Sequence, residues 1–310
     1  TLSNLNALIA ARHNAGLGSD PNSVLLVSED AHSSFIKCTR IMGLDDTNLV
    51  KIKTDNKGCM DMDNLKNSLD QCSINNKKIF AIVATLGTTV RGAIDPIKDI
   101  SDICKERNIW LHIDGSIGGI FGVTSIPIEG LNNINQANSI TINPQKIIGI
   151  TKTSSLLLVS NMRTLENTFS TGLPYISSKE NIINRGELGI QGSRPAEVIK
   201  LWLGLRSLGL KGMEDILNSS INRKDFFIKN INKNKFEIYS GPLHIISFLP
   251  KGLNTKDTDF WTQTKVNELM KNNFMLSRPK FKGKYYLRVV MGNYNTNESH
   301  IEELLKILHA

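Results

Sequence analysis

The chain has 310 residues, 40% of them hydrophobic, a length and composition that predict a globular protein with one large and one smaller domain. No apolar run approaches the roughly 18–20 residues that span a bilayer, and the first residues do not resemble a secretory signal, so we expect no membrane partner. The formal net charge of +8 does not indicate a nucleic-acid partner, because the lysines form no basic stripe with interleaved aromatic residues.

Helical and strand-like patterns alternate through the first half of the chain, beginning with a helical NLNALIAARHN soon after Thr1. This alternation is typical of an α/β fold with a mostly parallel sheet flanked by helices. Strands are expected at 24–28, 50–54, 79–85, 109–114, 139–143 and 155–159, and helices at 34–43, 62–69 and 97–108. In such sheets ligands bind outside the carboxyl ends of the strands. The residues at or just past those ends are His32, Thr89, Asp114 and Lys146.

The second half of the chain has a different pattern. A polar segment at 170–194 leads to Pro195, which we expect in the first turn of a helix that runs through 198–209. The remainder should form a smaller α+β unit, with helices at 213–231, 259–271 and 297–308 and strands near 236–240, 244–249 and 285–291. The expected domains are therefore a large one at 1–195 and, at 196–310, a connecting helix with a small C-terminal domain.

Two ionisable residues interrupt apolar runs, Asp114 in WLHIDGS and Lys146 in SITINPQK. Burying an unpaired charge costs several kcal/mol by rough estimate, so each residue needs a partner. A lysine and an acid at the ends of neighbouring strands, together with the amides of a helix N-terminus, suit pyridoxal phosphate. The lysine forms a Schiff base, the acid keeps the pyridine nitrogen protonated, and the amides hold the phosphate. The pattern therefore predicts a pyridoxal phosphate site.

Five motifs resemble the group II pyridoxal-dependent decarboxylases, which act on glutamate, cysteine sulfinate, aromatic amino acids or diaminobutyrate. They are SEDAHSS (28–34), ATLGTT (84–89), GAIDPI (92–97), WLHIDGSIGG (110–119) and SITINPQK (139–146). The resemblance covers the whole chain. It implies the fold of the fold-type I pyridoxal phosphate enzymes, a homodimer, and the decarboxylation of an L-amino acid to an amine. Against that family the chain lacks an N-terminal segment, so we expect a truncated protein.

The resemblance assigns roles to the residues at the strand ends. Lys146 takes the place of the family's Schiff-base lysine, and Asp114 that of the aspartate that binds the pyridinium nitrogen. His32 matches the histidine that stacks on the cofactor and helps to orient the substrate carboxylate. Thr89 matches the threonine beside that histidine.

Further residues match family positions around the phosphate and the substrate. Asn143 and Thr1 occupy positions that help to hold the phosphate, and Gln145 stands where relatives usually have a histidine. An amide still donates to phosphate but does not carry a proton. Tyr175 lies in the loop whose tyrosine returns a proton after carbon dioxide leaves, and Arg288 matches an arginine that binds the substrate α-carboxylate in glutamate-type members.

Each candidate also has a simpler structural interpretation. Asp114 is alternatively a carboxylate that caps the turn after its strand, Lys146 a solvated lysine, and His32 a cap for the helix that follows it. In the same way, Thr89 and Asn143 are interpreted as turn or strand residues, Thr1 as a helix cap, Tyr175 as a surface aromatic and Arg288 as an ion-pair partner.

Several chemically capable residues receive no functional role. His112, judged out of phase with Asp114, is interpreted as a core residue, and Arg194 as structural. The cysteines at 38, 59, 72 and 104 lack the spacing of a disulfide framework or a zinc site, which suits a reducing cytoplasm.

Two functions besides amino-acid decarboxylation stay open. One is a different reaction with the same fold and cofactor, as in an aminotransferase, a lyase or an aldehyde-forming enzyme. The second is that of an inactive, truncated homologue that keeps the fold, which the absent N-terminal segment favours.

Overall fold

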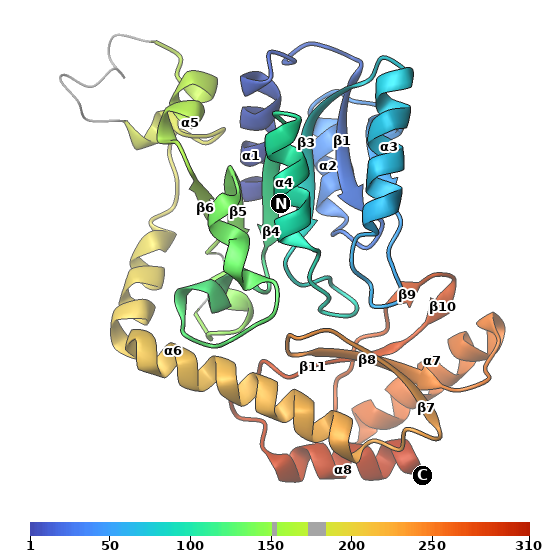
Figure 1. Ribbon diagram of the computed structural model, residues 1–310. Helices are drawn as coiled ribbons and strands as arrows, with labels where there is room; N and C mark the ends of the chain where they lie inside the picture. Colours follow the sequence, from blue (N-terminus) through green and yellow to red (C-terminus); the bar gives the residue numbers. More distant parts are fainter. Residues whose placement is uncertain (151–153, 173–183) are drawn as a thin grey trace.

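The computed structural model describes residues 1–150, 154–172 and 184–310. A six-stranded sheet forms the larger unit, and a smaller unit lies against one end of it (Figure 1). The strands are β1 (Ser23–Ser28), β2 (Leu49–Ile52), β3 (Lys78–Thr85), β4 (Trp110–Gly115), β5 (Ser139–Ile142) and β6 (Leu156–Val159). Their order is β2-β1-β3-β4-β5-β6, with β6 alone antiparallel to its neighbour. The predicted, mostly parallel α/β sheet is thereby confirmed.

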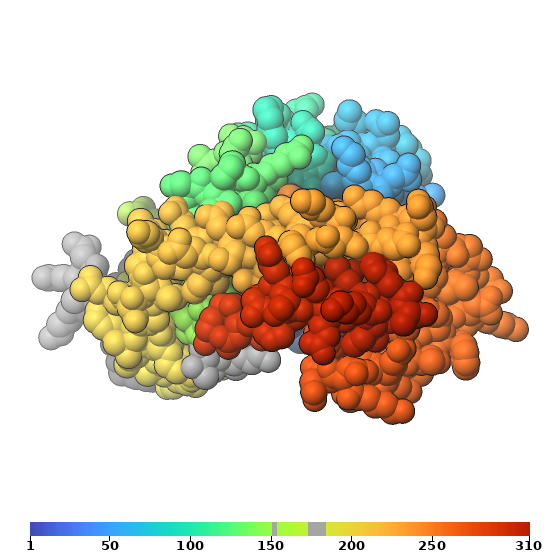
Figure 2. Space-filling model, turned by 90° about the horizontal axis from the view of Figure 1, so that it is seen from below, coloured from blue at the N-terminus to red at the C-terminus, as the bar shows by residue number. Residues whose placement is uncertain are grey.

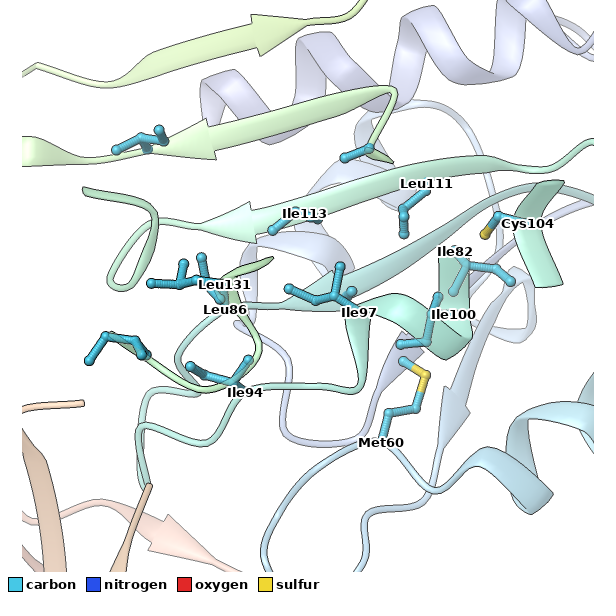
Figure 3. Close-up of a cluster of buried hydrophobic side chains, with 14 of the residues drawn as sticks. Met60, Ile82, Leu86, Ile94, Ile97, Ile100, Cys104, Leu111, Ile113 and Leu131 are labelled. Carbon is cyan, nitrogen blue, oxygen red and sulfur yellow. The ribbon is translucent and has the colours of Figure 1, made fainter. Parts of the chain in front are cut away.

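Helices cover both faces of this sheet, which is why its central strands are apolar along their whole length. On one face lie α1 (Leu2–Asn14) and α2 (Ser34–Ile41), and on the other α3 (Met62–Ile74) and α4 (Ile97–Glu106). Figure 3 shows part of the apolar core between the sheet and the helices α3 and α4, where Leu111 and Ile113 of β4 lie near Ile97 and Ile100 of α4. Successive side chains of a strand point to opposite faces, so Asp114 belongs to the face of α1 and α2.

The order of the parallel strands changes direction between β1 and β3, and ligands bind in such sheets at the carboxyl ends near that point. In the described part of the chain, five short 3-10 helices connect the elements: Asp46–Asn48, Gly119–Val123, Leu131–Gln136, Pro144–Lys146 and Arg185–Glu187. A further short helix, α5 (Met162–Phe169), was not expected from the sequence.

The smaller unit is an antiparallel sheet covered by helices. Its strands are β7 (Phe236–Ser240), β8 (Ile245–Pro250) and β11 (Leu287–Val290), in the order β11-β8-β7. The helices α7 (Thr255–Lys271) and α8 (Glu298–His309) close its separate apolar core. A hairpin of β9 (Lys280–Phe281) and β10 (Lys284–Tyr285) reaches toward the larger unit (Figure 1).

One long helix, α6 (Glu197–Asn230), joins the two units. The two helices predicted at 198–209 and 213–231 are consecutive parts of it, separated by a non-helical residue, Gly209, with φ 63° and ψ 179°. Met213 contributes to the core of the larger unit and Phe227 to that of the smaller one. Figure 2 shows α8 lying along α6 on the face seen from below.

The expectation that Pro195 lies in the first turn of this helix was wrong. The helix begins at Glu197 with Ala196 as its N-cap, so Pro195 lies just outside it. Its carbonyl nevertheless accepts a hydrogen bond from the amide of Glu197 at 2.8 Å. Within the described part of the chain, no helix is both long and apolar enough to cross a membrane.

Candidate active site

Asp114 lies near the end of β4, in register with Thr85 of β3 and Thr141 of β5. Its residue is 4% exposed. One carboxylate oxygen, Oδ1, accepts from the backbone amide of Ser116 at 3.1 Å, and the other, Oδ2, accepts from Asn4 Nδ2 at 3.3 Å. The first bond is the turn cap of the simpler interpretation. No ion pair links Asp114 to a cation among the described residues. Two hydrogen bonds therefore fix the position of this buried carboxyl group, and no positively charged side chain among those residues forms an ion pair with it.

Lys146 follows β5, the neighbouring strand, and ends a short 3-10 helix. The residue as a whole is exposed, yet the protein around its ammonium group removes enough water to lower its pKa. Arg288 lowers this pKa further, whereas Asp114 opposes the shift. A lysine with a lowered pKa spends more time as the neutral amine, which is the nucleophilic form.

His32 follows β1, on the other side of β3. Its Nδ1 accepts from the backbone amide of Ser34 at 3.2 Å, at the start of α2, so the simpler role as a helix cap is present. Burial lowers the pKa of His32; Asp114 raises it, while Lys146 lowers it. These interactions place His32 among the charges of the candidate site. They favour a neutral imidazole whose proton is on Nε2, because Nδ1 is the acceptor.

The start of α1 and the end of β5 meet in a chain of polar side chains. Asn143 Oδ1 accepts from the hydroxyl of Ser155 at 2.5 Å, and that hydroxyl is 2.7 Å from the hydroxyl of Ser3. Asn143 therefore has its amide nitrogen as the remaining donor group. Thr1 is the N-cap residue of α1, but its side chain makes no capping hydrogen bond. Gln145 is half-buried, and its Oε1 has no hydrogen-bond partner in the described part of the chain.

Arg288 brings the smaller unit to the site. It lies on β11, and its Nη1 donates to the carbonyl oxygen of Thr89 at 2.6 Å while its Nε donates to the Ser277 hydroxyl at 2.8 Å. Burial lowers the pKa of this guanidinium. Thr89, just past β3, thus contacts Arg288 through its backbone. Tyr175 falls outside the described residues.

The residues that sequence reasoning missed lie behind Asp114. His112 is fully buried, as expected of a core residue, but the judgement that it is out of phase with Asp114 was wrong. The two residues are two positions apart on β4 and therefore point to the same face. His112 Nε2 lies 3.2 Å from Asn4 Oδ1, and the same asparagine donates to Asp114. The available signal was this two-residue spacing.

Comparison with known proteins identifies relatives of the whole arrangement. Residues 2–248 match the sequence profile of the pyridoxal-dependent decarboxylase conserved domain. The acidic amino acid decarboxylase GADL1 of Xenopus tropicalis is 30% identical over 246 residues, which cover 75% of this chain and 48% of that protein. The aromatic-L-amino-acid decarboxylase of Bacillus atrophaeus is 30% identical over 319 aligned positions, covering 99% of this chain and 66% of that protein. The chain thus spans about half to two thirds of these relatives.

Solved structures have the same fold. Mouse CSAD superposes with a TM-score of 0.87 at 24% identity, over 99% of this chain and 69% of that one. Oryza sativa TDC, solved with PLP and tryptamine, superposes with a TM-score of 0.91 at 19% identity, over 99% of this chain and 67% of that one. This likeness confirms the expected fold class, that of the fold-type I pyridoxal phosphate enzymes.

Proposed function

Because the chain belongs to the family of pyridoxal-dependent decarboxylases, we propose that the protein containing it removes the α-carboxyl group of an L-amino acid, giving the amine and carbon dioxide. Pyridoxal phosphate is the cofactor of this proposal. The observation that carries it is the meeting of Asp114, Lys146 and His32 at the carboxyl ends of β4, β5 and β1.

The residues present fit the cofactor. Asp114 is a buried carboxylate with neutral hydrogen-bond donors on both oxygens and no ion-pair partner among the described residues, which suits a pyridinium N–H. Lys146 has a lowered pKa, which suits an amine that must attack an aldehyde. When bound, pyridoxal phosphate supplies an electron sink for the bond that breaks when carbon dioxide leaves. Asp114 would hold the proton on the pyridine nitrogen, and Lys146 would attach the cofactor covalently.

The α1 end of the site would hold the phosphate. The exposed amides at a helix N-terminus attract anions, and Thr1 is at that position in α1. Asn143, oriented by Ser155, would donate from its amide nitrogen. Gln145 would donate to the phosphate without titrating, since an amide has no proton to lose near neutral pH.

The substrate would meet residues from both units. His32 would present its Nε2–H to the substrate carboxylate, beside Thr89, while Ser34 holds the other ring nitrogen. Arg288 would bind the α-carboxylate from the side of the smaller unit, using guanidinium N–H groups beyond those that bond Thr89 and Ser277. Tyr175 would return a proton to the α-carbon after carbon dioxide leaves.

We also propose that the protein is a cytoplasmic homodimer whose chain folds as a large cofactor-binding domain, 1–195, and a connecting helix with a small domain, 196–310. The apolar core of the smaller unit is separate from the cores on the two faces of the larger sheet, which supports this division, and α6 contributes to cores of both units. Analytical ultracentrifugation of the protein that contains this chain tests the dimer, which a purely monomeric species would exclude.

The proposed activity is tested by two measurements on the same preparation. Borohydride reduction followed by peptide mapping should place a pyridoxyl group on Lys146, and a panel of L-amino acids should show release of carbon dioxide with equimolar amine. Lys224, a lysine of the smaller unit on α6, serves as the internal control and should stay unlabelled. A label on another lysine would overturn the assignment of Lys146. If Lys146 is labelled but no amino acid releases carbon dioxide, the assignment of the cofactor would stand and the proposed decarboxylation would be overturned.

A further inference from the structure

A buried chain of hydrogen bonds runs across the α1 face of the sheet and ends at Asp114. Trp110 Nε1 donates to the Ser139 hydroxyl at 2.8 Å, and that hydroxyl lies 2.8 Å from His112 Nδ1. His112 Nε2 lies 3.2 Å from Asn4 Oδ1, and Asn4 Nδ2 donates to Asp114 Oδ2 at 3.3 Å. The chain thus links β4 to β5, returns to β4 and continues through α1.

The Asp114 end, together with a neutral imidazole, fixes the direction of every hydrogen bond in this chain. The indole nitrogen of Trp110 only donates, and the Asp114 carboxylate only accepts. The Asn4 nitrogen must then face Asp114, so its oxygen accepts from His112 Nε2–H. Because a neutral imidazole with a proton on Nε2 has none on Nδ1, His112 Nδ1 accepts from the Ser139 hydroxyl, and the oxygen of that hydroxyl accepts from the Trp110 indole N–H. Burial keeps this imidazole neutral by lowering the pKa of His112 to about 4, against the opposing charge of Asp114.

The asparagine at the centre is fully used. Its second amide hydrogen is directed to the Ser34 hydroxyl of α2 at 3.3 Å, so both donors and the acceptor of the side chain have partners. Asn4 is 1% exposed and His112 is 0% exposed. A flip of the Asn4 amide would place its oxygen against the carboxylate and its nitrogen against the His112 N–H, two repulsive contacts in a region with little water. The side chain therefore has one favourable orientation.

We propose that Asn4 is a positioning residue, and that His112, set by Ser139 and Trp110, fixes the Asn4 amide so that it holds the Asp114 carboxylate in place for the pyridine nitrogen of the cofactor. This inference rests on the proposed function, because it gives Asn4 a role through the Asp114 contact to that nitrogen. A merely structural Asn4 would anchor α1 to the sheet and would have no preference for a ring nitrogen.

The test uses a matched pair of variants, Asn4→Thr and Asn4→Val, in the protein that contains this chain. Threonine and valine have nearly the same shape, but threonine keeps a hydroxyl that both donates and accepts hydrogen bonds, which valine lacks. The dissociation constant of pyridoxal phosphate is measured for both variants, and again with 1-deazapyridoxal phosphate, which lacks the ring nitrogen. We expect the Val variant to bind pyridoxal phosphate about tenfold more weakly than the Thr variant, the worth of one charge-assisted hydrogen bond. With the deaza compound the two variants should bind equally.

Two controls separate positioning from general damage. In an Asp114→Asn background the difference between Thr and Val at position 4 should disappear, because the pair acts through that carboxylate. Thr39→Val deletes another buried hydroxyl on the same face, one that donates to the carbonyls of Phe35 and Ile36 within α2, and should leave both dissociation constants unchanged. Equal binding of pyridoxal phosphate by the Thr and Val variants, or an equal loss with the deaza compound, overturns the proposal.

A second readout needs no cofactor. Nitrogen NMR of the histidine side chains should show His112 as the neutral tautomer protonated on Nε2, and this signal should move in Asn4→Val and much less in Asn4→Thr. A His112 protonated on Nδ1 overturns the inference even if pyridoxal phosphate binds. Failure of the wild-type protein to bind pyridoxal phosphate would instead overturn the proposed function, and with it the role of Asn4 toward the cofactor.

Discussion

Asp114 has hydrogen bonds to a side-chain amide and a backbone amide but lacks an ion-pair partner among the described residues. Neutral donors fix the position of a carboxylate without cancelling its charge, so the charge stays available to a cationic N–H. The same residue makes the turn cap of the simpler interpretation. Structure and chemistry are therefore separable at this position by a substitution that keeps the shape and removes the charge.

Asp114→Asn is expected to fold and to retain pyridoxyl labelling of Lys146. Its turnover should be slower, because the activation free energy should rise by about 2–4 kcal/mol, the range for losing a preorganised electrostatic partner. The amide oxygen still accepts from Ser116, so the turn is kept. Steady-state turnover with the best substrate of the amino-acid panel measures the effect.

Asp95→Asn is the matched control for Asp114→Asn. Asp95 is also buried, and it accepts from the backbone amides of Met60 and Thr85, each at 2.7 Å. Its replacement should lower stability while turnover per folded molecule stays unchanged. Near-wild-type turnover in Asp114→Asn, or an equal loss in both variants, would remove Asp114 from the proposed chemistry.

Tyr175→Phe tests the proposed return of a proton to the α-carbon. The substitution removes the phenolic hydroxyl and keeps the ring, so substrate binding and loss of carbon dioxide should persist. The yield of amine should fall in favour of carbonyl products, formed either by oxidative deamination with dioxygen as the oxidant or by abortive transamination, in which the cofactor would keep the amino group. The ratio of amine to aldehyde or ketone, measured by mass spectrometry, is the readout. Tyr294→Phe, at a tyrosine that is 65% exposed, is the control. An unchanged ratio and rate in the Tyr175 variant would leave that tyrosine without a catalytic role.

At the level of residues, the sequence identified the candidates that break a pattern. Asp114 and Lys146 stood out because ionisable side chains are costly in apolar strands. Asn4 did not, because a polar residue in a helix is ordinary unless the partner it meets is known. That partner, His112, is 108 positions away along the chain. Such pairings depend on how α1 packs on the sheet, which periodicity alone does not determine.

At the level of elements, the two units meet along three consecutive carbonyl groups just past β3. The carbonyl of Thr89 accepts from Arg288 of β11 at 2.6 Å, and that of Val90 accepts from the Ser247 hydroxyl of β8 at 2.5 Å. The carbonyl of Arg91 accepts from the backbone amide of Gly241, beyond β7, at 2.6 Å. The segment that carries Thr89 is thus fixed by the smaller sheet, which links the geometry of the site to the contact between the units.

Gly241→Ala is expected to weaken this contact. A Cβ atom at position 241 would lie 2.2 Å from the carbonyl oxygen of Gly92, so the two backbones would have to separate. The expected loss is about 1–3 kcal/mol in the free energy of unfolding, as for other overpacked sites. Urea unfolding followed by circular dichroism measures it. Gly18→Ala is the control, because a Cβ atom there meets nothing within 4 Å, and equal stabilities of the two variants would contradict the prediction.

Most elements followed from the sequence because the parallel strands are continuous apolar runs and the surface helices have clear periodicity. The hairpin of β9 and β10 was missed, since each strand has only two residues. Its place is set by contacts with the other unit. The Arg91 guanidinium lies 4.6 Å from the ring centre of Phe281 and forms a buried ion pair with Asp30 at 2.7 Å. Contacts between units have no local pattern that could be read in advance.

For the molecule as a whole, two buried histidines make stability depend on pH. Burial lowers the pKa of His112 and of His244 from 6.5 to about 4; Asp114 opposes this shift in the first, and Arg223 reinforces it in the second. Between these values the unfolded chain binds protons that the folded chain excludes. Each histidine thus contributes stability that is fully present above about pH 6.5 and is lost toward pH 4, at about 1.4 kcal/mol per pH unit.

Asp95 acts in the opposite direction. Burial raises its pKa from 3.8 to about 7, although two backbone amides donate to it and favour the charged form. The folded protein therefore holds a proton that the unfolded chain releases. The stability from this group is present below about pH 4 and is lost as the pH rises toward 7.

Because the two effects have opposite signs, they predict how the slope of the unfolding free energy against pH changes in each variant. This prediction does not depend on the total stability. His244→Phe should reduce the rise of the free energy of unfolding with pH by about 1.4 kcal/mol per unit, and Asp95→Asn should increase it by a similar amount. Urea titrations of wild type and both variants at pH 4.5, 5.5 and 6.5 measure the slopes, whatever each substitution does to stability at a single pH. Slopes that match the wild type in both variants would mean that neither group changes its proton affinity on folding.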